Sequence, residues 1–265
     1  MAIPKKIHWC WLSGDPLPKS LQKCINSWKR IMPDYEIILW DKKRFDIHSV
    51  KFVADACALR KWAFAADYIR LYALYTEGGI YLDSDVMVYK RFDEFLHHAA
   101  FSGIEHHLSR KDNIDCNAIQ AAIIGAEKGN DWIKKCMEYY YQTTFELGEG
   151  GRIKVKISPQ VLADCAHTYF GFSYHEDFDT LQLLKGNIAI YPQKTFPTAF
   201  YGATMQSHAI HVCEASWNDN AQKRLKKESI FKKIDRKLCA NSRFFAMLHY
   251  KKNQYLNKLH TIFKR

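Results

Sequence analysis

The stretch WAFAADYIRLYALYTEGGIYLDSDV, residues 62–86, decides the fold. Its first part is apolar over several helical turns, and with the residues before it predicts a helix from about Val50 to Thr76, closed by a glycine pair. The apolar run Ile80-Tyr-Leu then leads directly into Asp83-Ser84-Asp85. Helix, glycine pair, buried strand and acids, in that order, predict one unit of an α/β domain with the acids at the carboxyl end of its strand.

Apolar runs and helical periodicities alternate on both sides of this stretch. Short apolar runs predict strands near residues 3–12, 36–41, 100–105, 118–124, 188–191 and 209–212. Helical spacing or a helix-start pattern predicts helices near residues 17–32, 131–142 and 158–167. The alternation predicts a layered α/β domain on a largely parallel sheet, spanning residues 1–220.

The net charge of +11 is confined to the end of the chain. Residues 222–265 hold fourteen Lys and Arg against two acids, whereas residues 1–221 hold 25 bases and 26 acids. The apolar residues of the basic segment recur at roughly helical spacing. Residues 221–265 are therefore expected to form a basic amphipathic helical tail, which suits either the inner face of an anionic membrane or packing on the domain.

The chain shows the signs of a cytoplasmic protein. Its first residues carry no long apolar run after their charges, so no secretory signal is expected. The eight cysteines form no C-x-x-C pair, which favours reduced thiols. No apolar stretch is long enough for a spanning helix.

The acids Asp83 and Asp85 are the first candidate for chemistry. In an extended backbone, residues i and i+2 point to the same face, so the two carboxylates are expected to lie together. Like charges held together need a cation or a shared proton, and Mg²⁺ or Mn²⁺ would supply the charge. A solvated loop after a strand is the alternative.

Asp67 and Arg70 lie three residues apart on the apolar helix before these acids. Charged groups on such a helix need a partner or an open cleft. Pairing with each other is one explanation. The other is that Arg70 faces a phosphate group while Asp67 meets sugar hydroxyls.

The string ADYIRLYALYTEGGIYLDSDV, residues 66–86, resembles the signature of glycosyltransferase family 32, the sugar-binding-region enzymes with a DXD motif. The opening IPKKIHWCW, residues 3–11, and the segment DYEIILWD, residues 34–41, are similar to the family's first two strands. AIHVCEASW, residues 209–217, is similar to its closing segment. The resemblance spans about residues 3–217 and implies a GT-A-type, Rossmann-like nucleotide-sugar domain.

The family's roles are placed on the matching positions. The implied donor-binding residues are Trp9, Trp11, Asp67, Arg70, Asp83, Ser84, Asn117 and Trp217. The implied metal ligands are Asp83, Asp85, His211 and Ser216, for Mn²⁺ or Mg²⁺. Asp85 and Arg70 are the implied catalytic residues. Trp9 or Trp11 would stack on the donor base. The alternative is that both are core aromatics, which is the more common role of such residues. His211 and Asn117 likewise have structural alternatives, as a hydrogen-bonded strand histidine and as a partner of turn backbone groups.

Two departures from the family bear on these roles. Cys213 and Glu214 stand where bacterial relatives often carry a second His and other polar residues, which leaves the third metal ligand open. Ser158-Pro159-Gln160 replaces the more usual Thr/Ser-Gly-Pro, which weakens the assignment of the acceptor side.

The resemblance implies a metal-dependent retaining glycosyltransferase. It would move a hexose from a UDP- or GDP-sugar to a glycan acceptor, with a lipid-linked oligosaccharide in capsule or O-antigen synthesis as the expected case. A metal-dependent phosphohydrolase or nucleotidyltransferase is the alternative, since paired acids serve those reactions as well. Nucleic acid is not an expected partner, because the basic segment carries no recognisable nucleic-acid module.

Overall fold

The computed structural model describes residues 2–108, 115–148, 154–198 and 203–213. The predicted basic tail, residues 221–265, lies outside the described residues, as does the domain boundary near residue 220. Both stay predictions. In the described part, no helix has the length and apolar character that crossing a bilayer requires.

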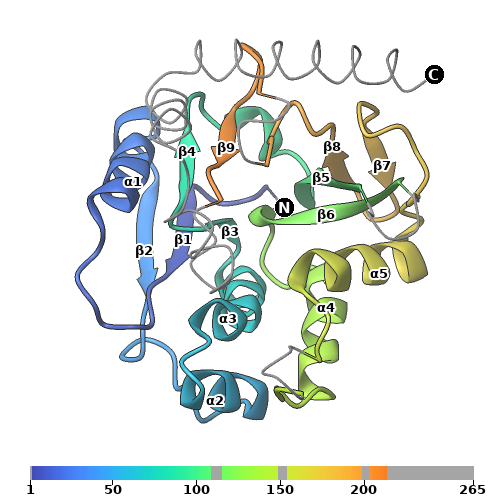
Figure 1. The fold of residues 1–265 in the computed structure, drawn as a ribbon. Helices are drawn as coiled ribbons and strands as arrows, with labels where there is room; N and C mark the ends of the chain where they lie inside the picture. Colours follow the sequence, from blue (N-terminus) through green and yellow to red (C-terminus); the bar gives the residue numbers. More distant parts are fainter. Residues whose placement is uncertain (1, 109–114, 149–153, 199–202, 214–265) are drawn as a thin grey trace, which may run out of the picture.

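The described chain forms an α/β fold on a mixed sheet (Figure 1). Its elements are β1 (Lys6–Cys10), α1 (Lys19–Ile31), β2 (Glu36–Trp40), α2 (Lys51–Ala58), α3 (Trp62–Glu77), β3 (Gly79–Leu82), β4 (Val86–Val88), the 3₁₀ turn η1 (Asp93–Phe95), β5 (Ala100–Leu108), β6 (Asp115–Ala126), α4 (Asp131–Tyr141), α5 (Ser158–Phe170), β7 (Gln182–Leu184), β8 (Ile188–Tyr191) and β9 (Ala209–His211).

The seven-stranded sheet has the order β2-β1-β3-β6-β5-β8-β7. Five of its strands, β2, β1, β3, β5 and β8, run in one direction, while β6 and β7 run against them. The predicted α/β class with a largely parallel sheet is therefore confirmed. β7 was not predicted, because three residues carry too little pattern to mark a strand.

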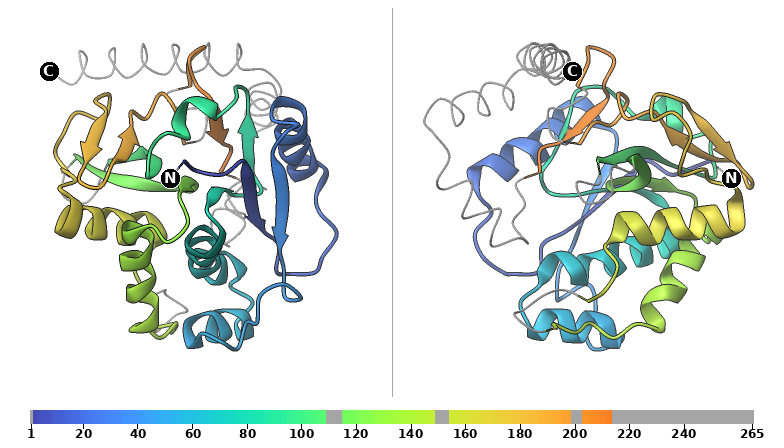
Figure 2. Two further views of the ribbon diagram at one scale, coloured as in Figure 1. Left: turned by 180° about the vertical axis from the view of Figure 1, so that it is seen from behind. Right: turned by 45° about the vertical axis from the view of Figure 1, so that its right-hand side comes forward.

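Helices cover both faces of the sheet. Helices α2 to α5 lie on one side, while α1 and the small β4–β9 sheet lie on the other, as the back and oblique views also show (Figure 2). Alternate strand residues divide between two hydrophobic cores: Tyr81 belongs to the core under α3, and Ile80 and Leu82 to the core under α1. Ile25 and Trp28 are the buried α1 residues that belong to this second core.

The predicted helix from Val50 to Thr76 is two helices. Arg60 adopts a left-handed conformation with φ 54°, and the N–H of Lys61 donates to the carbonyl of Ala56 at 2.8 Å. A left-handed residue directly after the last turn is a common way to end a helix, and that residue is usually glycine. The sequence carries Arg at this position, so the break between α2 and α3 had no glycine to mark it.

The glycine pair between α3 and β3 fixes the start of the central strand. Gly78 and Gly79 have φ values of 67° and 121°, which other residues rarely adopt. A Cβ on Gly79 would lie 2.9 Å from the carbonyl oxygen of Lys6 and 3.0 Å from Nε2 of His8. This close approach lets the chain pass from α3 into the sheet within a single turn.

Candidate active site

Asp83 and Asp85 flank a turn rather than lying on one extended strand. β3 ends at Leu82, the N–H of Val86 donates to the carbonyl of Asp83 at 3.0 Å, and β4 begins at Val86. The predicted extended backbone is therefore wrong at this point, because the chain turns from one sheet into the other. The two carboxylates nevertheless stay close, and Ser84 lies between them, half-buried.

His211 joins the two acids from a distant part of the sequence. It lies opposite Val86 in the β4–β9 pairing, and the N–H of Val212 donates to the carbonyl of Asp85 at 3.0 Å. One ligand atom from each of Asp83, Asp85 and His211 lies within 4.8 Å of the other two. The turn and the β4–β9 pairing thus assemble a group of two carboxylates and one imidazole.

The imidazole of His211 is held from both sides. Its Nε2 lies 3.3 Å from Oδ1 of Asp85, and its Nδ1 lies 3.4 Å from Sγ of Cys213. Burial alone would lower the pKa of His211, but the Asp85 carboxylate raises that pKa well above its ordinary value. Cys213 itself takes a left-handed conformation with φ 57°.

Arg70 is the buried cation of the site. It donates to the carbonyls of Ala121 at 2.7 Å and Ala66 at 3.3 Å, and it lies 2.8 Å from Asp67 and 3.5 Å from Asp83. Burial alone would lower its pKa, but the facing acids raise it, so Arg70 stays charged. The predicted pairing of Asp67 with Arg70 is present, and Asp83 is also within reach of the same guanidinium.

Asp67 is a buried acid beside Arg70 with a displaced pKa. Its side chain is 12 % exposed, and burial raises its pKa to about 7 against the opposing effect of Arg70. The ordinary value is 3.8. The raised pKa brings the protonation of Asp67 close to neutral pH.

Tyr81 is a site residue that the sequence reasoning missed. Its hydroxyl donates to Oδ1 of Asp83 at 2.9 Å, and the guanidinium of Arg70 lies over its ring, 4.8 Å from the centroid. The signal was present in the sequence, because Tyr81 precedes Asp83 by two residues and alternates with the apolar Ile80 and Leu82.

Other predicted donor-binding residues lie in structural contacts. Trp9 packs edge-on against Trp28, with ring centroids 6.3 Å apart, and the indole N–H of Trp11 donates to the carbonyl of Asp15 at 2.8 Å. Asn117 is buried, and its amide donates to the carbonyl of Glu176 at 2.6 Å. Ser216 and Trp217 lie outside the described residues.

Residues 18–102 match the sequence family described as the glycosyltransferase sugar-binding region containing DXD motif. The chain thus carries a glycosyltransferase region of the DXD type, and Asp83-Ser84-Asp85 lies within the matched residues. The matched residues run from α1 to the start of β5 and include β3, the strand that precedes the acids.

Two curated proteins are similar to parts of the chain. Subversion of eukaryotic traffic protein A of Legionella pneumophila is 26 % identical over 66 % of this chain and 31 % of its own length. Inositol phosphoceramide mannosyltransferase 3 of Schizosaccharomyces pombe is 32 % identical over 38 % of this chain and 29 % of its own length. The chain thus spans less than a third of the length of either relative.

Solved structures show more distant likenesses. The PaToxG glycosyltransferase is 19 % identical, with a TM-score of 0.46 over 63 % of this chain and 70 % of that one. The galactosyltransferase LgtC, solved with donor and acceptor sugar analogs, is 13 % identical, with a TM-score of 0.46 over 84 % of this chain and 94 % of that one.

Proposed function

We propose that the protein is a metal-dependent, retaining hexosyltransferase that uses a nucleotide-diphosphate sugar as donor. The observation that carries this proposal is the convergence of Asp83, Asp85 and His211 within 4.8 Å, inside a domain whose sequence matches a glycosyltransferase sugar-binding region. A structural cluster of acids would not need an imidazole delivered from a strand more than a hundred residues away.

The donor set fits a divalent cation. Carboxylate oxygens suit Mg²⁺ and Mn²⁺, and an imidazole nitrogen adds a ligand that favours Mn²⁺ over Mg²⁺. Asp83, Asp85 and His211 would hold the ion, with Ser216 as a further candidate. When bound, the ion would stabilise the negative charge of the departing nucleoside diphosphate.

The protein's own groups would orient the donor. Arg70 is fixed by two backbone carbonyls, so its charge is positioned before the donor arrives and costs little reorganisation. Asp67 would meet sugar hydroxyls, with Asn117 beside them, and Trp9 or Trp11 would stack on the base. With no side chain assigned as nucleophile, we propose same-face attack, in which the departing phosphate accepts the proton of the acceptor hydroxyl.

A lipid-linked acceptor at the inner face of a membrane completes the proposal, with capsule or O-antigen synthesis as the setting. The fission-yeast relative is named for mannosyl transfer and for inositol phosphoceramide, a lipid. The predicted basic tail would attract the chain to anionic lipid, at about 1 kcal/mol for each Lys or Arg near the surface.

Thermal unfolding with a panel of UDP- and GDP-sugars, with and without Mn²⁺, tests this function. A donor at one hundred times its dissociation constant stabilises a protein by about 2.7 kcal/mol, which is measurable as a rise in Tm. We expect one donor to raise Tm only when Mn²⁺ is present. Asp85→Ala should lose this rise, whereas Asp93→Ala, an exposed acid outside the site, should keep it.

Absence of a shift for every donor under every metal would contradict the proposed function. The phosphohydrolase alternative is separated by turnover without acceptor. A transferase hydrolyses its donor slowly until an acceptor hydroxyl is supplied, whereas a hydrolase releases product at full rate without one.

A further inference from the structure

Helix α1 differs in charge from every other described α-helix. It carries Lys19, Lys23, Lys29 and Arg30 and no acid, whereas α2, α3, α4 and α5 each contain at least as many acids as Lys and Arg. Residues 1–221 have almost equal numbers of acids and bases, so this concentration of charge is local. We call these four residues the α1 cationic face.

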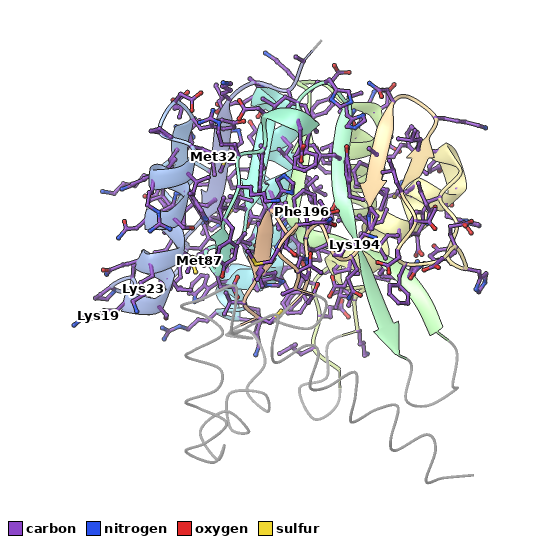
Figure 3. The ribbon with its side chains drawn as sticks, turned by 90° about the horizontal axis from the view of Figure 1, so that it is seen from above. Lys19, Lys23, Met32, Met87, Lys194 and Phe196 are labelled. Atoms are coloured by element: carbon purple, nitrogen blue, oxygen red, sulfur yellow. The ribbon has the colours of Figure 1, made fainter. Side chains whose placement is uncertain are left out.

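The α1 cationic face lies opposite the buried side of the helix. At about 100° per residue, Lys19, Lys23 and Arg30 form one stripe, and Trp28 lies on the other side of the axis. All four cationic residues are exposed, while Trp28 is fully buried. Lys19 and Lys23 project away from the body of the protein, beside Met87 of β4 (Figure 3).

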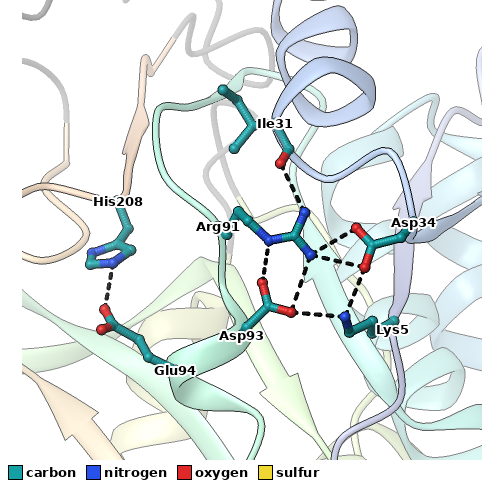
Figure 4. Close-up of polar contacts among 7 residues, drawn as sticks. All are labelled: Lys5, Ile31, Asp34, Arg91, Asp93, Glu94 and His208. Carbon is teal, nitrogen blue, oxygen red and sulfur yellow. Dashed lines mark hydrogen bonds and ion pairs between the residues drawn. The ribbon is translucent and has the colours of Figure 1, made fainter.

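Neighbouring cations show what a structural role looks like in this region. Arg91 and Lys5 are both held by Asp34 and Asp93, in contacts of 2.6 to 2.9 Å (Figure 4). Within the described part of the chain, by contrast, no ion pair involves Lys19, Lys29 or Arg30. In the part of the chain that the structure describes, Lys19, Lys29 and Arg30 therefore do not fasten one element to another.

Helix stability does not explain the position of Lys19. Lys19 is the first residue of α1, where the helix dipole is positive, and the first turn holds no acid. A cation at this end is unfavourable, since negative side chains are the ones stabilised there. Lys29 and Arg30, by contrast, lie in the last turn, where the dipole favours cations, so Lys19 is the charge of this face that the helix itself does not explain.

The α1 cationic face is connected directly to the candidate site. β1 and β3 are parallel neighbours, so the carboxyl end of β1 lies beside the carboxyl end of β3, where Asp83 follows. The segment that leads to α1 leaves the sheet at this end. The indole N–H of Trp28 donates to the carbonyl of Val86 at 2.7 Å, and the hydroxyl of Ser27 accepts from the N–H of Val88 at 2.9 Å. These hydrogen bonds fix the position of α1 relative to the turn that carries Asp85. A surface that binds α1 is therefore held at a fixed position relative to that turn.

We propose that the α1 cationic face docks the folded domain on an anionic lipid bilayer and so turns the site edge toward that surface. A bilayer suits the face better than nucleic acid, because no aromatic side chain among the exposed residues of α1 is available to stack on bases. The functional reason for this docking rests on the membrane-bound acceptor proposed above. Lipid binding itself is measured without donor, so its result does not depend on the proposed function.

The test compares two variants of the full chain that lose the same charge. One carries K19Q, K23Q, K29Q and R30Q. The control carries K43Q, K128Q, K134Q and K185Q, four exposed lysines outside α1. Both are sedimented with phosphatidylcholine vesicles that contain 30 % phosphatidylserine and with pure phosphatidylcholine vesicles, after equal Tm values have shown that both fold.

Each basic residue near an anionic bilayer contributes about fivefold to the binding constant, so the α1 variant should bind roughly a hundredfold or more weakly than the control at low salt. Equal binding of the two variants would overturn the proposal and assign membrane attraction to the tail. Loss of nucleic-acid binding by the α1 variant with vesicle binding unchanged would overturn it as well. Loss of donor binding in the Tm panel, with lipid binding intact, would refute the function alone.

Discussion

Two networks of ion pairs, one buried and one exposed, show how the same residue types acquire different roles. In the buried network Arg70 faces Asp67 and Asp83, and the Arg70 and Asp67 side chains are 5 % and 12 % exposed. In the exposed network Arg91 and Lys5 face Asp34 and Asp93, and Arg91 and Asp34 are 41 % and 45 % exposed. Contact distances are similar, so geometry alone does not separate the two networks.

Burial separates them through the pKa values of the acids. Hydrogen bonds from Lys5 and Arg91 lower the pKa of Asp34 to about 2, whereas burial raises that of Asp67 to about 7. Water screens the exposed charges, while Arg70 is the cation that compensates the buried carboxylate of Asp67. The exposed network holds surface segments together. The buried network places the guanidinium of Arg70 and the carboxyl of Asp67 beside the Asp83–Asp85–His211 group.

The largest expected effect distinguishes the acids of the site from those of the surface. Asp85→Asn removes one charge from the proposed metal group, and we expect sugar transfer to fall by about 10³-fold or more, since a metal ion supplies several kcal/mol of charge stabilisation. Asp93→Asn should leave transfer unchanged. Steady-state transfer assays and calorimetric Mn²⁺ titration of both variants measure the difference. Undiminished Mn²⁺ affinity in Asp85→Asn would rule out the ligand role.

The next effect breaks the buried network and is measured as stability. Arg70→Met leaves Asp67 buried without its cation and the carbonyl of Ala121 without its donor, so we expect a loss of about 3–5 kcal/mol in the free energy of unfolding. Arg91→Met should cost far less, because water solvates the acids that it leaves behind. Urea unfolding gives both values.

A double variant shows whether uncompensated charge is the cause. Adding Asp67→Asn to Arg70→Met removes the isolated carboxylate and should restore part of the lost stability. If the double variant is no more stable than Arg70→Met, the loss comes from packing of the Arg70 side chain and not from the buried charge.

The sequence predicts the local features of the fold better than its long-range features. The strand before Asp83 and the apolar helix around Arg70 follow from periodicity, because each is set by residues close together in the chain. The break at Arg60 was missed because Arg took the left-handed position that glycine normally occupies. The turn at Ser84 was missed because Val86 continues the apolar pattern on the other side of it.

The candidate site divides along the same line. Asp83 and Asp85 are only two residues apart in the sequence, and the family resemblance named His211. Only the β4–β9 pairing shows that His211 lies beside Asp85, with the thiol of Cys213 at the other ring nitrogen. Burial of Asp67 depends on neighbours from several elements, so no local pattern could have indicated that its pKa lies near neutral pH.

A third prediction follows from the opposite pKa shifts of Asp67 and Asp34. The pKa of Asp67 is raised from 3.8 to about 7 in the folded protein, so the stability linked to its proton is lost as pH rises across that range. That of Asp34 is lowered from 3.8 to about 2, so its contribution is lost as pH falls across that range. Asp67→Asn should therefore gain stability relative to the wild type between about pH 4 and 7.

Unfolding free energies of the wild type, Asp67→Asn and Asp34→Asn, measured from pH 3 to pH 8, check these signs. Asp34→Asn should differ from the wild type above about pH 4 and converge with it toward lower pH. A constant offset between Asp67→Asn and the wild type across this range would mean that folding does not change the pKa of Asp67, with Arg70 offsetting the effect of its burial.

The smallest expected effect is a difference between the two networks in how strongly salt changes their contribution to stability. Lys5 contacts Asp34 at 2.7 Å and Asp93 at 2.9 Å, so Lys5→Met removes two exposed ion pairs. The resulting loss of stability should be small at low salt and should vanish near 1 M NaCl, where the screening length is about 3 Å. Arg70→Met should keep its full cost at both salt concentrations, because ions do not enter the space between Arg70 and Asp67. Unfolding curves of both variants at the two concentrations make the comparison. If the cost of Arg70→Met also disappeared in high salt, water and ions would reach that pair, and burial could no longer account for the raised pKa of Asp67.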